Sequence, residues 1–261
     1  MNRQKILHIA FWIISIPLIV ILLSFVNQEA KNKTYQQFNV RINYEGKDYL
    51  ITKKDIKTQV ESKFDSIAGQ NVQQVNEAKI EQEIERNPYV INAEVFTTID
   101  GICKAEVYQR TPLVQLIDEN GKSMYMDVDG VLMPDKQGLP VRVIVVNGHL
   151  NLDTIDPSID DLCVKNMKPE VLKDVYTLAT KVNHDRLFQA TVEQIYIDEN
   201  RQYELVTKLG QHTVLIGSTK NLDDKLKKLK IFYNNAQSKE GWGEYEHLNM
   251  KYKNQVIGNK R

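Results

Sequence analysis

The five histidines come first, because imidazole groups serve many acid–base and metal sites near neutral pH. No H-E-x-x-H or C-x-x-C spacing occurs in the chain, and His184 and Asp185 form an isolated pair at the expected end of a helix. We therefore interpret the histidines as structural or surface residues, and the sequence predicts no metal site. They are His8, His149, His184, His212 and His247.

Motifs for nucleophiles and phosphate groups are also missing from the sequence. No serine is followed three residues later by lysine, and neither G-x-S-x-G nor a glycine-rich nucleotide loop occurs. Asp127 and Asp129 in "DVDG" could suggest calcium, but an EF-hand loop needs another ligand before its glycine and a glutamate at its end. A turn held by aspartate hydrogen bonds is the preferred interpretation. The sequence thus predicts neither an enzyme nor a cofactor.

The two cysteines, Cys103 and Cys163, are too few for a disulfide framework. Cys103 lies on the apolar face of an expected strand, where a thiol behaves as a small buried hydrophobic group. A Cys103–Cys163 disulfide is the alternative if this part of the chain lies outside the cytoplasm.

The composition is that of a folded globular protein. Of 261 residues, 42% are hydrophobic and 26% are charged, with Lys+Arg 34 balancing Asp+Glu 34. Proteins that bind nucleic acid normally carry a basic excess, so the sequence does not favour that class.

An apolar run from Ile6 to Val26 predicts a transmembrane helix, since 21 residues at about 1.5 Å each span the roughly 30 Å core of a bilayer. A cleaved signal peptide is the alternative, but its apolar stretch would be shorter and would end in small residues. Residues 1–5 are too few to fold, while the long remainder can be translocated. We expect 1–5 to be cytoplasmic, 27–37 to be a polar spacer and the bulk to be extracytoplasmic.

The next part reads as strand, helix, helix, strand, strand. Period-two alternation begins at Phe38, and Thr52 precedes an apolar helical face formed by Ile56, Val60, Phe64 and Ile67. A second helix carries Val75, Ile80 and Ile84 and ends before Asn87-Pro88. A hairpin then turns at Asp100-Gly101; Ala93, Val95, Thr97 and Ile99 share one face of its first strand, and Cys103, Ala105 and Val107 share one face of its second strand. Such an order predicts a small sheet with both helices on one side.

From Thr111 the chain predicts a mixed, β-rich α+β domain. A meander turns at Asn120-Gly121 and Asp129-Gly130, and a strand over 141–146 ends at Asn147-Gly148. An acidic loop, a helix over about 168–185, three strands and a helix over about 222–235 follow. The last apolar alternation lies in "EHLNMKYKNQVIG".

Three motifs give the chain a family resemblance. They are "NPYVINAEVF" leading into "GICKAEVYQRTP", then "MYMDVDGVLMP", and finally "EHLNMKYKNQVIG". Together, in this order, they resemble the FtsQ/DivIB family of bacterial cell-division proteins, in a form typical of the Bacteroidota. The resemblance implies a POTRA domain over 38–110 and a β domain over 111–261, both after the transmembrane helix.

The resemblance also implies a non-catalytic scaffold of the inner membrane at the division septum, which joins FtsB and FtsL and extends to FtsK and other division proteins. In this family the last strand of the β domain accepts a strand of FtsB. An ordinary closing strand is the alternative interpretation from the residues alone. Gln255 and the lack of an aromatic residue after Gly258 depart from the family pattern. The matching positions are Met250, Tyr252, Asn254, Val256, Ile257 and Gly258.

Two other functional classes remain open at this point. A POTRA-bearing secretion or assembly factor would normally carry several POTRA units or an outer-membrane barrel. A membrane-anchored cell-wall enzyme would need a catalytic cluster, and the motifs above supply none.

Overall fold

The computed structural model describes residues 12, 15–17, 21, 34–44, 49–72, 75–135, 141–153, 155, 163–166, 170–209, 212–239, 242–253 and 255–260. Two compact units divide the chain, Met1–Asn43 with Ile51–Gln109, and Tyr44–Leu50 with Arg110–Arg261. Most of the predicted transmembrane segment, together with residues 1–5 and 27–33, lies outside the described residues. Within the described ranges, no helix combines the length and hydrophobicity needed to span a bilayer.

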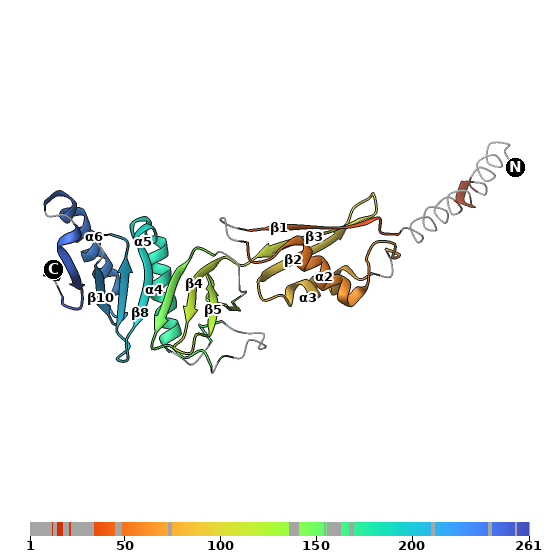
Figure 1. Cartoon of the computed structure of the whole chain (residues 1–261). Coiled ribbons are helices and arrows are strands. Elements are labelled where there is room, and N and C mark those ends of the chain that lie inside the picture. Colours follow the sequence, from red (N-terminus) through yellow and green to blue (C-terminus); the bar gives the residue numbers. More distant parts are fainter. Residues whose placement is uncertain are drawn as a thin grey trace. The chain divides into compact units, whose positions relative to one another are not determined.

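The first unit has the predicted order of strand, helix, helix, strand, strand. Its sheet has the order β1-β3-β2, with β1 parallel and β2 antiparallel to β3. Both helices lie on one face of this sheet (Figure 1), where Ile56, Val60, Ile80 and Ile84 are fully buried. The elements are β1 (Gln37–Asn43), α2 (Lys53–Phe64), α3 (Glu77–Glu85), β2 (Val90–Thr97) and β3 (Ile102–Gln109).

Local capping sets the helix boundaries. Thr52 and Asp55 form a reciprocal capping box at the start of α2, and Asn76 caps α3 by accepting from the backbone N–H of Lys79. The expected face of α2 extended to Ile67, but the helix ends earlier because Asp65 adopts a φ of +57°. Ile67 is still fully buried, now from the connection that follows the helix.

The hairpin confirms one predicted face and corrects the other. Cys103, Ala105 and Val107 are completely buried, as the alternation predicts. On β2 the pattern stops at Thr97, because the backbone N–H of Gly101 donates to the carbonyl of Thr98 at 2.9 Å and closes the turn. The prediction for Ile99 was therefore wrong: its side chain is 92% exposed in the turn.

Neither cysteine forms a disulfide in the structure, so the disulfide alternative is not realised. Burial raises the pKa of the Cys103 thiol from 9.0 to about 12, and the negative charge of Glu77 adds to this shift. An unfolded chain loses this proton near pH 9, whereas the folded chain retains it. The folded state consequently binds more protons between pH 9 and 12, and the free energy of unfolding falls as the pH rises through this window.

Replacing Cys103 with alanine is expected to remove this alkaline loss of stability. At about pH 10.5 the contribution of Cys103 to the loss in the native chain corresponds to roughly 2 kcal/mol. Urea unfolding of the full chain at about pH 7.5 and pH 10.5 measures it, with the Cys163→Ala variant as the control that retains the loss. The same pH dependence in all three proteins would contradict the assignment.

The second unit is built on a nine-stranded sheet of order β12-β11-β10-β9-β8-β7-β4-β5-β6. Strand pairs β4–β7, β7–β8 and β10–β11 are parallel, and the others are antiparallel. The elements are β4 (Pro112–Ile117), β5 (Ser123–Asp127), β6 (Leu132–Pro134), β7 (Ile144–Gly148), α4 (Glu170–His184), α5 (Arg186–Thr191), β8 (Val192–Ile197), β9 (Tyr203–Thr207), β10 (Thr213–Gly217), α6 (Leu222–Lys239), η1 (Trp242–Glu244), β11 (Tyr245–Asn249) and β12 (Ile257–Lys260).

This arrangement confirms the predicted mixed α+β domain and adds two features. The short helix α5 was not predicted, because six residues are too few to show a helical pattern of apolar positions. Asp185 caps its start by accepting from the backbone N–H of Leu187 at 2.9 Å. The last apolar stretch forms two strands, β11 and β12, instead of one. A single core joins the apolar sides of α4, α5 and α6 to alternate residues of the strands.

Three hairpins of this unit share one turn design. In each, an aspartate Oδ1 accepts from the backbone N–H groups two and four residues later, and the residue three positions on has a positive φ. The "DVDG" stretch belongs to this set, so its interpretation as an aspartate turn is confirmed. The turns begin at Asp118, Asp127 and Asp198, and their positive-φ residues are Gly121, Gly130 and Arg201.

Candidate functional site

The nine-stranded sheet ends in two strands of unlike character. At one end, β6 is three residues long, its Leu132 and Met133 are buried, and Pro134 has no N–H to offer. Val131, next to β6, is also bridged to Cys163. At the other end all four residues of β12 are exposed. Because an exposed edge strand presents backbone donors and acceptors to another chain, β12 is the candidate site.

The structure separates the residues predicted for partner binding. Ile257 and Gly258 lie on β12 itself, and the Ile257 side chain is 41% exposed. Tyr252 is 49% exposed in the connection from β11, and Val256 is half-buried against the core. Asn254 lies outside the described residues.

Met250 is not exposed at the edge, which corrects its place among the predicted partner-binding residues. Its N–H donates to the carbonyl of Leu215 at 2.9 Å, so the chain still follows β10 at this point. The side chain is consequently fully buried in the core and cannot meet a partner. Met250 therefore directly follows β11 within the core, and the exposed edge strand starts only at Ile257.

Gly258 lets an aromatic ring support the edge strand. This glycine is paired with Leu248 of β11, and a Cβ placed on it would lie 2.5 Å from Cδ1 of Tyr245. The Tyr245 ring packs in turn against Phe232 of α6, with ring centroids 5.4 Å apart. On the same strand, Lys260 forms an ion pair with Glu244 at 3.1 Å. Side chains of β11 and of the residues before it thus support β12, while β12 itself stays exposed.

Helix α6 also fixes the connection between β11 and β12. The ammonium group of Lys228 donates to the carbonyl oxygen of Tyr252 at 2.5 Å and to that of Met250 at 3.4 Å. These bonds tie the connection between β11 and β12 to α6. Lys228 therefore positions the segment that delivers β12 to the end of the sheet.

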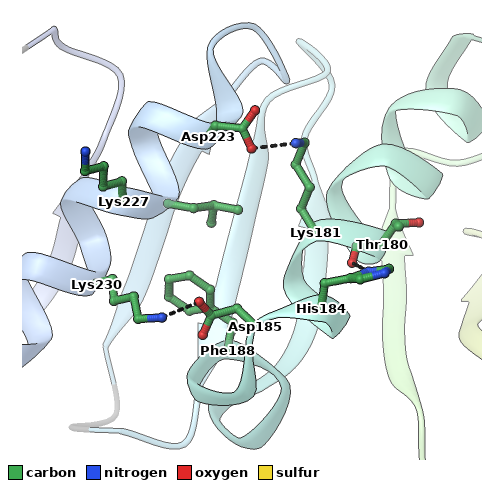
Figure 2. A pocket seen from close by; sticks show the side chains of 9 residues that line it. Thr180, Lys181, His184, Asp185, Phe188, Asp223, Lys227 and Lys230 are labelled. Atoms are coloured by element: carbon green, nitrogen blue, oxygen red, sulfur yellow. Dashed lines mark hydrogen bonds and ion pairs between the residues drawn. The ribbon is translucent and has the colours of Figure 1, made fainter.

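A surface cavity of about 490 Å³ lies between α6 and the helices α4 and α5 (Figure 2). Two ion pairs cross it, from Lys181 to Asp223 at 2.5 Å and from Lys230 to Asp185 at 2.6 Å. Burial tends to raise the pKa of the Asp185 carboxyl. Hydrogen bonds from Lys230 and from the N–H of Leu187 outweigh this effect and hold the pKa below its ordinary value. The two ion pairs link α6 to α4 and to Asp185 at the start of α5.

The imidazole of His247, on β11 beneath the edge, lies 2.8 Å from the Thr213 hydroxyl and is half-exposed. Across the described part of the chain, no group of three or more His, Cys, Asp or Glu side chains is arranged to hold a metal ion.

Sequence reasoning missed several residues that build the edge. Asn259 and Lys260 complete β12, although the family resemblance ended at Gly258. Lys228 and Tyr245 support the edge from α6 and β11. Nothing in the local sequence identifies them, because each acts on a segment more than ten residues away.

Comparison with known families agrees with this architecture. The family described as FtsQ/DivIB, C-terminal related, matches residues 111–259, which is more than half of the chain. A POTRA-like domain matches residues 34–108, the region of the three-stranded sheet and its two helices. A comparison with curated proteins returns no significant match. The chain therefore belongs to the FtsQ/DivIB, C-terminal related family and carries a POTRA-like domain before the domain that defines it.

Proposed function

We propose that the protein is a non-catalytic scaffold of the bacterial division machinery. In this proposal, residues 6–26 anchor it in the inner membrane with residues 1–5 in the cytoplasm, and the POTRA-like domain (38–110) and the β domain (111–261) lie on the outer side at the septum. Membership of the FtsQ/DivIB family supports a role in division. Its partners would be FtsB and FtsL, with FtsK and other division proteins as further candidates.

The observation that carries the proposal is the exposed edge of β12. A partner strand beside β12 would gain backbone hydrogen bonds, and its alternate side chains would contact those of β12. We propose that FtsB supplies this strand. Ile257 and Gly258 would then contact it directly, together with Asn259 and Lys260, while Tyr252 would contact the segment that precedes or follows the added strand.

Replacing Ile257 with aspartate is expected to weaken FtsB capture by about 10- to 30-fold, because a charge would lose water where the strands meet. Since this side chain is 41% exposed, the fold should be retained. The measurement is binding of FtsB to the purified full chain. A strain whose only copy carries Ile257→Asp should also form filaments.

Ile231→Asp is the control, since Ile231 is 51% exposed on α6 and is not part of β12. It introduces the same charge into the same domain. Equal binding and normal division with both variants would refute the proposed edge. Normal division after complete depletion of the protein would refute the scaffold role itself.

A further inference from the structure

The outer edge of β2, in the POTRA-like domain, is occupied by carboxylates from α3. The backbone N–H of Val95 donates to Glu81 Oε1 at 2.7 Å, and that of Ala93 donates to Glu85 Oε1 at 3.3 Å. One step further along the strand, the hydroxyl of Thr97 donates to Glu77 Oε1 at 2.5 Å. We call Glu77, Glu81 and Glu85 the glutamate row.

The spacing of these contacts follows from the geometry of the two elements. Residues four apart on an α-helix are separated by about 6 Å along the axis, and residues two apart on a strand by about 6.8 Å. Helix α3 runs antiparallel to β2, so that each turn of the helix meets the next outward-facing position of the strand. Three successive glutamates can therefore reach three successive edge positions.

Strand β2 would otherwise be a strong template for strand addition. It is a terminal strand of its sheet, eight residues long, and rich in β-branched and aromatic residues. Phe96 and Ile91 are 40% and 49% exposed on it. Long apolar edge strands of this kind tend to pair with other chains unless the fold protects them. An incoming strand would have to accept hydrogen bonds from the same N–H groups that the glutamate row already uses.

We propose that the glutamate row is an autoinhibitory contact, which seals the β2 edge of the POTRA-like domain against added strands. The carboxylates occupy the N–H groups of Ala93 and Val95, and Glu77 extends the row to the Thr97 side chain. The hydroxyl of the buried Tyr35, 3.0 Å from the Thr97 Oγ1, steadies the last contact. Strand pairing by this protein is thereby directed away from β2.

The test compares two triple variants of the full chain at Glu77, Glu81 and Glu85. In the alanine variant no acceptor remains, and amide hydrogen exchange at Ala93 and Val95 should become about 10- to 100-fold faster. In the glutamine variant a carbonyl oxygen remains as acceptor, and exchange should stay within about three-fold of the native chain. Unchanged exchange at Val107, at the centre of β3, reports that the sheet is intact.

A peptide that copies β2, VINAEVFT with two added lysines, probes the edge directly. It should bind the alanine variant at least about 10-fold more tightly than the native chain or the glutamine variant. Glu94→Ala, on the same strand but with its exposed side chain on the opposite face, should behave as the native chain. Native-like exchange at Ala93 and Val95 in the alanine variant, or no gain in peptide binding by it, would overturn the proposal.

Discussion

Replacing Asp127 with alanine is expected to lower the free energy of unfolding by about 3–5 kcal/mol. The Asp127 side chain is completely buried, and its Oδ2 accepts from Nη1 of Arg110 at 2.8 Å. Its Oδ1 accepts from the backbone N–H groups of Asp129 at 2.9 Å and Val131 at 2.7 Å. Alanine would remove this acceptor from three donors. They are the guanidinium of Arg110, whose side chain is 19% exposed, and the two backbone N–H groups.

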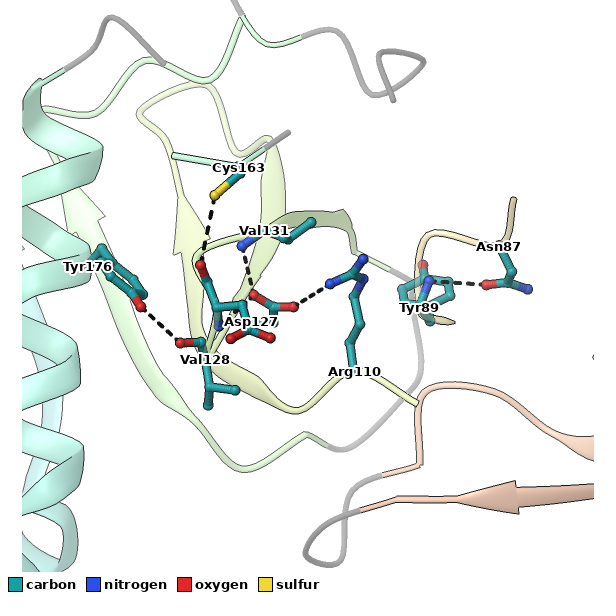
Figure 3. A network of polar contacts seen from close by, with 9 residues as sticks. Asn87, Tyr89, Arg110, Asp127, Val128, Val131, Cys163 and Tyr176 are labelled. Carbon is teal, nitrogen blue, oxygen red and sulfur yellow. Dashed lines mark hydrogen bonds and ion pairs between the residues drawn. The ribbon is translucent and has the colours of Figure 1, made fainter. Parts of the chain in front are cut away.

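The turn that Asp127 organises is also a meeting point of distant segments (Figure 3). The Tyr176 hydroxyl, from α4, donates to the carbonyl of Val128 at 3.0 Å, and the N–H of Val164 donates to the carbonyl of Gly130 at 2.8 Å. Loss of the carboxylate would therefore loosen contacts to a helix and to residues 163–166, besides the turn itself. Urea unfolding of the full chain measures the loss.

Asp198→Ala provides the matched control for Asp127→Ala. Asp198 makes the same two bonds to backbone N–H groups, at 2.8 and 2.7 Å, but no arginine in the described part of the chain pairs with it, and it is only half-buried. We expect this variant to lose about 1–2 kcal/mol. Equal losses in the two variants would show that the Arg110 pair and the burial add nothing.

Replacing Gly148 with alanine is the second change with a large expected effect, a loss of about 3–6 kcal/mol. Gly148 ends β7 with a φ of +100°, which side chains rarely adopt. A Cβ here would lie 2.1 Å from the carbonyl oxygen of Ile197, on the paired strand β8. That oxygen cannot withdraw freely, because it also accepts from the N–H of His149 at 2.8 Å.

Gly121→Ala separates the clash at Gly148 from backbone strain. Gly121 has a φ of +80°, but a Cβ there meets nothing within 4 Å. Its replacement should cost about 1–2 kcal/mol, from the left-handed backbone alone. If the two alanine variants unfolded at similar urea concentrations, the clash at Gly148 would cost little. The strands β7 and β8 would then have to separate easily at this point.

The order of elements could be predicted from the sequence because it depends on short-range chemistry. Period-two alternation identifies β2 and β3, and Asn87-Pro88 stops α3 after Glu85. Aspartate side chains bond to backbone groups two and four residues away, so the turn at Asp127 is recognisable without any knowledge of the sheet. The family resemblance rests on the same local motifs, which explains why the family matches agree with it.

The sheet edges were decided only by the tertiary structure. Met250 and Ile257 are alike in sequence as apolar residues of a terminal stretch, yet one is fully buried and the other is 41% exposed. Their difference arises because α6 connects β10 to the parallel strand β11, so that β11 lies inside the sheet. The chain then turns back into β12, which forms the edge. Likewise, the glutamate row reads as a solvated helix face until α3 is placed beside β2. Periodicity reports which side of an element is apolar, whereas the neighbour that covers each backbone group is fixed by contacts between residues far apart in the chain.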